Sequence, residues 1–110
     1  MTTNDEHIIV ARVRQCFTDG RVSFTQHARF EMAEEGISVE EIAQAISNAM
    51  LVENYPDHRR GPCCLLSGET DQRRPIHLVC TPGSPDVIVI TVYEPIPPKW
   101  IDRVTRWRRT

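Results

Sequence analysis

The stretch SVEEIAQAISNAMLVENYP, residues 38–56, contains the point at which the chain changes from helical to extended patterning. Ser38 and Glu41 form a capping-box pattern, and apolar residues follow at helical spacing: Val39, Ile42, Ala43 and Ile46. After Asn48 the hydrophobic period changes, and MLVENYP, residues 50–56, is typical of a strand. The sequence therefore predicts helices before this stretch and strands after it.

Two further helices are expected upstream. An amphipathic helix over residues 4–18 begins at a capping box and is stopped by an Asp-Gly pair. Residues 21–24 form a short extended piece that leads to Thr25. The hydroxyl of Thr25 can cap a second helix, which runs to Glu35 and ends at Gly36.

Three more strands are expected downstream, at residues 63–69 (CCLLSGE), 76–80 (IHLVC) and 87–93 (VIVITVY). The last has no polar alternation, so it should be a central strand covered on both faces. Pro98 would then lie in the first turn of a short C-terminal helix. These elements predict a single α+β domain over residues 1–110, with three N-terminal helices packed on one face of a four-stranded antiparallel sheet.

The composition, 40% apolar and 25% charged over 110 residues, is that of a soluble globular domain. No apolar run approaches the ~18 residues that a membrane helix needs, and residues 1–10 carry acids where a signal peptide has basic residues. We therefore expect a cytoplasmic protein. The four cysteines lack CxxC spacing and should be reduced, with Cys63 and Cys64 on opposite faces of a strand.

The net charge of −2 is unevenly distributed. Residues 1–50 carry four arginines against eight acids, whereas five of the 13 basic residues lie between Lys99 and Arg109. Such a basic end can neutralise the phosphates of a nucleic acid. It equally suits the solvated end of a helix, where the helix dipole favours positive charge.

His27 and Glu31 lie four residues apart in an expected helix, so their side chains share one face. The carboxylate would orient the imidazole for proton transfer. A metal site would need a third ligand, for which His77 is the candidate, but no metal-binding spacing supports it, and neither a metal nor a cofactor is predicted. The alternative, favoured for a helix histidine taken alone, is a ring that packs and bonds a backbone carbonyl.

His77 alternates with Ile76 and Leu78 and should face the opposite side of the sheet. Tyr93 ends the last strand, and Lys99 follows shortly after it. Phosphoryl chemistry on RNA uses such a combination, in which a histidine or tyrosine moves protons and cations stabilise the phosphate. The alternatives are a half-exposed surface histidine and a tyrosine that packs with its hydroxyl in water.

Paired arginines occupy two expected hairpin loops, at Arg59-Arg60 and Arg73-Arg74. Such pairs suit bidentate capture of phosphate or carboxylate, although more often they keep turns soluble. Arg59, Arg60 and Arg73, together with Lys99, are therefore the candidate phosphate contacts.

Five segments occur in a fixed order over about residues 23–100: HARFEMAEEGIS, ENYPDH, CCLLSGE, RPIHLVC and ITVYEPIPPKW. As a set they resemble the bacterial family catalogued as domain of unknown function 4258. The family's element order is similar to that of RelE-type toxins and their BrnT-like relatives, which are small ribonucleases of toxin–antitoxin pairs, and this is an analogy of fold. The positions that match the family's recurring polar residues are His27, Tyr55, His77, Tyr93, Glu94, Lys99 and Trp100.

The resemblance implies a toxin-type ribonuclease with RNA as substrate and an antitoxin as partner. In this hypothesis His27 or His77 moves the proton, Tyr93 assists, and the candidate phosphate contacts bind RNA. Two departures count against it: many family members carry arginine where this chain has Glu31 and Glu35, and the pI is near 6.1.

Two other hypotheses remain open. In the first, the protein is a non-enzymatic module that binds a protein or small ligand through the sheet face bearing His77 and Tyr93. A metal-binding protein using His27, Glu31 and His77 is the weaker alternative.

Overall fold

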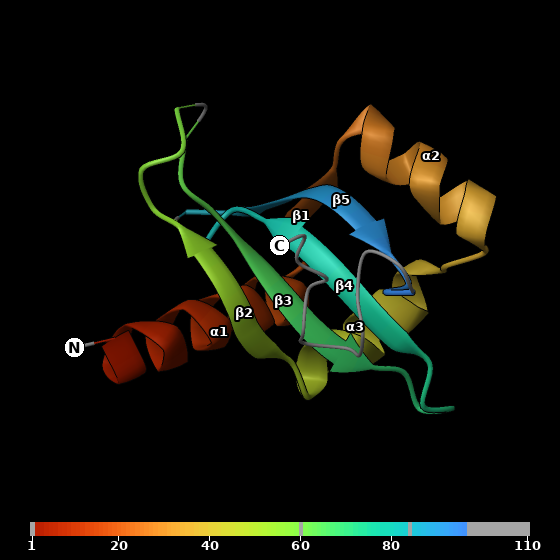
Figure 1. Ribbon diagram of the computed structural model, residues 1–110, viewed down its shortest axis with the longest axis horizontal. Coiled ribbons are helices and arrows are strands. Elements are labelled where there is room, and N and C mark those ends of the chain that lie inside the picture. The colour runs from red at the N-terminus through yellow and green to blue at the C-terminus, as the bar shows by residue number, and fades with distance from the viewer. Residues whose placement is uncertain (1, 60, 84, 97–110) are drawn as a thin grey trace, which may run out of the picture.

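The structure is a computed structural model that describes residues 2–59, 61–83 and 85–96. The chain begins with helix α1 (Thr2–Asp19) and a short strand, β1 (Val22–Phe24) (Figure 1). Two further helices follow, α2 (Gln26–Glu35) and α3 (Val39–Ser47). Four longer strands complete the described part of the chain: β2 (Met50–Tyr55), β3 (Cys63–Glu69), β4 (Pro75–Cys80) and β5 (Val87–Tyr93). The predicted α+β class and the change from helices to strands after Asn48 are confirmed.

The prediction of a four-stranded antiparallel sheet is wrong, because the sheet has five strands and is mixed. The strand order is β1-β5-β4-β3-β2, and β1 pairs in parallel with β5 through Val22 to Val87 and Phe24 to Val89. Residues 21–24 had been expected to be only a short extended piece before a helix. Three residues are too few to show strand periodicity, and their partner lies 65 positions away, so only tertiary contacts reveal the pairing.

The predicted ends of α2 and the predicted start of α3 are confirmed, whereas α1 begins at Thr2, before the capping box that was expected to start it at residue 4. The Thr25 hydroxyl accepts a hydrogen bond from the backbone N–H of Ala28 at 3.0 Å, and Gly36 ends α2 in the left-handed conformation with φ of 62°. Ser38 and Glu41 form the complete capping box at the start of α3. The chain therefore reverses between α2 and α3 within three residues, Gly36 to Ser38.

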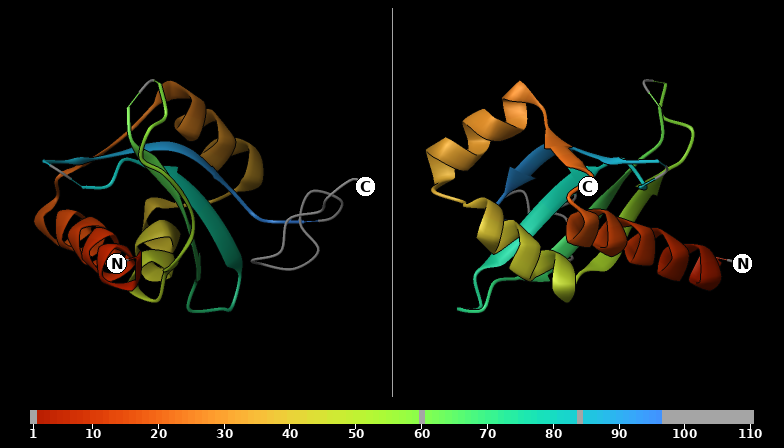
Figure 2. Two further views of the ribbon diagram at one scale, coloured as in Figure 1. Left: turned by 60° about the vertical axis from the view of Figure 1, so that its left-hand side comes forward. Right: turned by 180° about the vertical axis from the view of Figure 1, so that it is seen from behind.

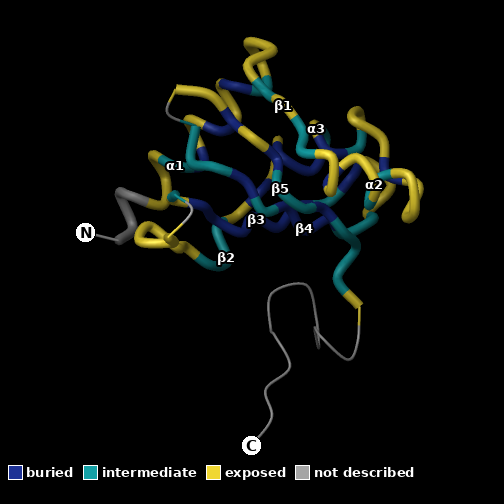
Figure 3. The backbone as a smooth tube through the Cα atoms, turned by 90° about the horizontal axis from the view of Figure 1, so that it is seen from above, coloured by how far each residue is buried: buried dark blue, intermediate teal, exposed yellow. Residues whose placement is uncertain are grey.

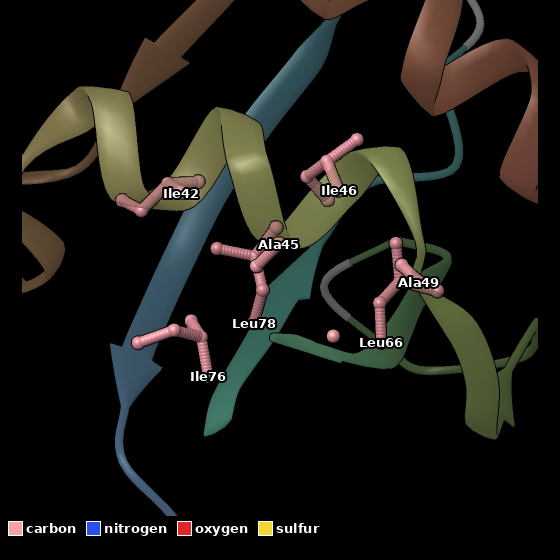
Figure 4. Close-up of a pocket in the computed structure, with 8 residues that line it drawn as sticks. Ile42, Ala45, Ile46, Ala49, Leu66, Ile76 and Leu78 are labelled. Atoms are coloured by element: carbon pink, nitrogen blue, oxygen red, sulfur yellow. The ribbon is translucent and has the colours of Figure 1, made fainter. Parts of the chain in front are cut away.

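Helix α3 packs closely on the sheet. Ile42, Ala45 and Ile46 of the helix face Leu66 of β3 and two apolar side chains of β4, Ile76 and Leu78 (Figure 4). The space between these side chains is too small for a water molecule. The approach depends on Gly68, because a Cβ there would lie 1.9 Å from the carbonyl oxygen of Ala45.

Helices α1 and α3 lie on one side of the sheet, and α2 runs along β5 (Figures 2 and 3). Val13 of α1, Ala28 of α2 and Ile42 of α3 all enter one core with alternate residues of the strands. Cys64 belongs to this core and Cys63 does not, which confirms that the two cysteines lie on opposite faces of β3.

The strand that is covered on both faces is β3, not β5. Residues Cys63 to Gly68 are all buried, whereas Ile88 of β5 is 43% exposed. Strand β5 is flanked by β1 and β4 and is therefore internal, as predicted, but only alternate residues of its first half are buried. The expected C-terminal helix at Pro98 lies outside the described residues. None of the described helices combines the length and apolar character that a membrane span requires.

Candidate functional site

His77 and Tyr93 are in direct contact. They are opposite each other in the antiparallel pairing of β4 with β5, so both side chains project from the same face. The His77 Nδ1 lies 3.3 Å from the Tyr93 hydroxyl, and the two rings meet edge to face with centroids 5.4 Å apart. This contact is the strongest link between two predicted site residues, and the expected orientation of His77, away from Ile76 and Leu78, is confirmed.

The pair lies on the side of the sheet opposite to the core that α1 and α3 cover. We call this side the distal face. Alternation along the strands and their register assign to it the following residues: Glu53, Tyr55, Cys63, Leu65, Ser67, Glu69, His77, Val79, Thr91 and Tyr93. Apolar and hydrogen-bonding side chains are interspersed along it, with carboxylates on β2 and at the end of β3.

The central residues of the distal face are as buried as the core. Leu65 is 1% exposed, and Ser67 and His77 are fully buried. Leu65 is not part of the apolar core cluster, which contains residues of α1, α2 and α3. His77 is therefore not the half-exposed surface histidine of one hypothesis.

His27 belongs to a different pair. Its side chain is 65% exposed on α2, and its Nε2 lies 3.3 Å from a carboxylate oxygen of Glu31, as the spacing predicted. The same carboxylate accepts hydrogen bonds from the backbone N–H of Val92, at 3.0 Å, and from the hydroxyl of Thr91. Glu31 thus anchors α2 to β5 as well as contacting His27.

The sequence analysis did not predict that Glu31 and Glu35 accept hydrogen bonds from backbone N–H groups of β5 and the residue after it. Strand β5 pairs with β1 only as far as Val89, and beyond that point its edge faces α2. Glu31 accepts from Val92 N–H, and Glu35 accepts from Glu94 N–H at 2.9 Å. Two carboxylates one helical turn apart therefore replace a missing neighbouring strand. The feature of the sequence that could have indicated this role is the four-residue spacing of the two acids, which places both on one face of α2.

The predicted phosphate contacts do not gather at His77 and Tyr93. Arg59 is exposed in the loop before β3, and Arg73 is exposed in the turn after it. The seven residues of β3 separate these loops, a distance of about 20 Å along a strand. Arg60 and Lys99 lie outside the described residues.

Arg74 is an internal connector. Its guanidinium donates to Glu94 at 2.8 Å, to Glu41 at 3.4 Å, and to the carbonyl oxygens of Glu35 and Gly36. The hydrogen bond to Glu94 is the main reason why the pKa of Arg74 is raised. The Arg73-Arg74 pair was predicted to suit capture of phosphate or carboxylate, and the carboxylates that Arg74 contacts belong to the chain itself. Glu94, which the family resemblance had marked as a candidate polar position, makes this contact within the chain.

The described residues contain no cluster of three or more His, Cys, Asp or Glu that would hold a metal ion. The four cysteines are free and buried. Cys64 and Cys80 are opposite each other on β3 and β4, and the Cys64 thiol donates to the Cys80 carbonyl oxygen at 3.5 Å. Hydrogen bonding to Cys64 and burial raise the pKa of the Cys80 thiol.

The geometry can now be compared with known proteins. Residues 24–94 match the family model described as Domain of unknown function (DUF4258). The chain belongs to this family. The matched region begins at the end of β1, includes α2, α3 and strands β2 to β5, and ends directly after Tyr93. His27, His77 and Tyr93 all lie within it.

Searches of curated proteins and of solved structures gave no match to this chain. The similarity to RelE-type and BrnT-like toxins therefore stays a hypothesis of fold analogy.

Proposed function

We propose that this member of the family is a binding module that recognises a polypeptide segment through the distal face. The observation that carries the proposal is the composition of the distal face, where Leu65 and Val79 project beside the His77–Tyr93 pair on the side of the sheet away from α1 and α3. A sheet face with this composition needs a covering layer, since leaving it in water would expose contiguous apolar surface. The face is therefore suited to hold a peptide.

Charge selects the class of peptide. Residues 1–96 contain 14 acidic and eight basic residues, a net charge of −6. The distal face carries Glu53 and Glu69, and both are only partly buried. A basic segment is attracted to such a surface, whereas the phosphates of RNA are repelled by it. We infer that the ligand is a basic polypeptide with aromatic or aliphatic side chains.

Titration calorimetry with synthetic peptides tests this proposal. A basic peptide that contains tryptophan should bind, and an acidic peptide with the same aromatic content should not. Glu69→Lys should weaken binding by about tenfold, the equivalent of about 1.4 kcal/mol, because an attraction becomes a repulsion. The matched control is Glu34→Lys on the exposed side of α2, which should bind as the wild type does. Equal affinity for the two peptides would contradict the proposal.

RNA cleavage is the second candidate, and the contact between His77 and Tyr93 favours it. An imidazole and a phenol within hydrogen-bond reach can pass a proton between them. This function predicts growth arrest when the wild-type chain is overproduced, and loss of arrest in His77→Asn and Tyr93→Phe.

His77→Asn and Tyr93→Phe should each reduce the rate of RNA cleavage in vitro by about a hundredfold or more. His27→Ala, which leaves the pair intact, is the control. Normal growth of cells that contain abundant folded wild-type protein would exclude this candidate.

A further inference from the structure

We propose that the outer edge of β2, together with a hollow between β2 and α1, binds an extended basic segment of a partner protein. The segment would extend the sheet by one strand and place an aliphatic side chain in the hollow. This surface lies at the edge of the sheet and on its helix side, apart from the distal face. The inference therefore goes beyond the proposed function.

The first argument is the position of β2 in the sheet. It is the last strand in the order β1-β5-β4-β3-β2, and in the described part of the chain no strand pairs with its outer edge (Figure 1). Along six residues, Met50–Tyr55, alternate backbone N–H and C=O groups point toward that edge. Met50, at the start of the strand, is 50% exposed. The edge thus offers a template for pairing with an extended polypeptide.

The second argument is the hollow beside this edge. Val10 of α1 and the segment Ala49 to Leu51 give it an apolar lining. Its volume is about 270 Å³, below the usual range for drug-sized ligands, so it suits a single aliphatic side chain. The N-terminal part of α1 continues beyond the edge of the sheet (Figures 1 and 2). A strand added to β2 would therefore lie against α1 with the hollow between them.

The third argument is the charge at the mouth of the hollow. Arg14 lines it, but its guanidinium donates to the carbonyl oxygens of Ile46 at 3.0 Å and Ala49 at 3.1 Å. This charge serves the fold, because a cation at the end of α3 complements the helix dipole. Glu6, exposed on α1, also lines the hollow. A lysine or arginine beside the aliphatic side chain would be attracted to this carboxylate.

Charge also selects a different protein over a second copy of this chain. Residues 1–96 have 14 acidic and eight basic residues, and pairing two copies of β2 would bring two acidic strands together, Glu53 included. Edge strands use bulges and charges against indiscriminate pairing, and β2 has both, since its register shifts between Leu51 and Glu53. The occupant must match the edge in charge as well as in backbone, which a basic segment does.

Hydrogen exchange of the full chain, followed residue by residue by NMR, tests the proposal. The probe is a blocked heptapeptide with lysine at both ends and a central leucine between two valines. Saturation with this peptide should slow exchange of alternate β2 amides at least about tenfold, because they gain acceptors, and should leave β4 unchanged. The same peptide with its interior amides methylated cannot form a strand ladder and should give no protection.

Side-chain changes test the hollow and its charge. A peptide with alanine in place of leucine should bind about tenfold more weakly, and so should the leucine peptide to Ala49→Leu, which fills the hollow. Glu6→Lys should weaken binding of the leucine peptide about threefold or more, whereas Glu34→Lys on α2 is the matched control and should not. Because Glu6 is exposed, this variant decides the matter if Ala49→Leu does not fold.

Three results would overturn the inference. The first is no binding of the leucine peptide at about millimolar concentration. The second is binding that protects the distal-face strands and not the edge of β2. The third is protection of β2 that rises with protein concentration alone, which would assign the edge to a second copy.

The two binding surfaces are separable by mutation. Glu69→Lys should weaken the tryptophan-containing basic peptide of the distal face and leave the leucine peptide unaffected, while Glu6→Lys should do the reverse. Loss of only one of these effects identifies which proposal is wrong. Equal loss of both peptides in Glu6→Lys would show that no separate site exists at the edge of β2.

Discussion

At the scale of single residues, Glu41 and Arg74 show how one ion pair holds three elements together. Glu41 closes the capping box of α3 and contacts Arg74 at 3.4 Å, and Arg74 also binds Glu94 after β5 and the carbonyl oxygens at the end of α2. The side chains of Arg74 and Glu41 are each less than one third exposed, so water screens them only in part. The ion pair therefore helps to fix the position of α3 relative to the end of α2 and the end of β5, in addition to stabilising the start of α3.

Glu41→Gln should reduce the stability of the protein at neutral pH and have little effect in acid. The backbone N–H of Ser38, and then Arg74, lower the pKa of Glu41. A carboxyl with a lowered pKa stabilises the fold above its unfolded-state pKa, near 4.3, and this contribution is lost as the pH falls through the lower folded value. Urea unfolding at pH 7 should show a loss of about 0.5 to 2 kcal/mol, the usual range for a cap.

The control for this prediction is Glu40→Gln. Glu40 is exposed in the same first turn of α3 and is not part of the capping box. A difference between Glu41→Gln and the wild type that stayed constant from pH 7 to pH 3 would contradict the assigned role of the charge.

At the scale of elements, the neighbouring helices α2 and α3 contact the sheet in different ways. Helix α3 lies flat on β3 and β4 and buries Ile42, Ala45 and Ile46. Helix α2 buries only Ala28 completely and is tied to β5 mainly through carboxylates that accept backbone hydrogen bonds. One helix depends on close packing and the other on polar contacts at a strand edge.

Glu31→Arg should destabilise the protein. An arginine has no acceptor, so the Val92 N–H would lose its partner beside a positive charge. Leaving a partly buried backbone donor without an acceptor costs about 1 to 3 kcal/mol. Thermal unfolding should show the loss in Glu31→Arg and not in Glu34→Arg, which makes the same change on an exposed position of α2. Equal melting temperatures for the two variants would refute this role of Glu31.

Gly68→Ala should be among the most damaging single-methyl changes in the chain. The added Cβ would lie 1.9 Å from the backbone oxygen of Ala45, and a backbone atom cannot move aside as a side chain can. We expect a loss of about 3 kcal/mol or more in chemical denaturation, at or beyond the upper end of typical overpacking. Gly20→Ala is the comparison: its Cβ meets no atom within 4 Å, so only the strain of its φ of 73° remains, about 1 to 2 kcal/mol. A smaller loss in Gly68→Ala than in Gly20→Ala would contradict the packing argument.

At the scale of the whole molecule, the sheet is the stable centre and its two faces differ. One face meets α1 and α3 through an apolar core, whereas the distal face mixes apolar residues with His77, Ser67 and carboxylates. Strand β3 is buried on both sides and is paired on both edges, by β2 and β4. Regions with this much burial open only when the whole domain unfolds.

Native-state hydrogen exchange should therefore rank the elements. The amides of β3 and β4 should exchange at the rate of global unfolding, while those of α2 should exchange faster through a local opening, because its burial is slight. Mass spectrometry of peptides from each element, measured with increasing denaturant, gives both rates. Protection of α2 equal to that of β3 would show that its carboxylate contacts hold it as firmly as packing holds α3.

The local parts of the structure were predictable from the sequence because their causes are local. The Thr25 cap, the Gly36 end and the Ser38 capping box each depend on residues within one helical turn, and the strands at residues 63–69 and 87–93 have clear β-branched or apolar runs. His77 and Tyr93 were predicted as site residues from strand alternation and family motifs. Their mutual contact was not, because it depends on the register between β4 and β5.

The sequence by itself determined helices α1 to α3, strands β2 to β5, and which side of β4 His77 occupies. Only the tertiary structure decided that β1 joins β5 in parallel, that Glu31 and Glu35 complete the edge of β5, and that Arg74 binds the chain's own carboxylates. The physical reason is the range of the interactions. Caps and periodicity act between neighbours in sequence, whereas strand pairing and ion pairs join residues about 20 to 65 positions apart, whose proximity exists only after the chain has folded.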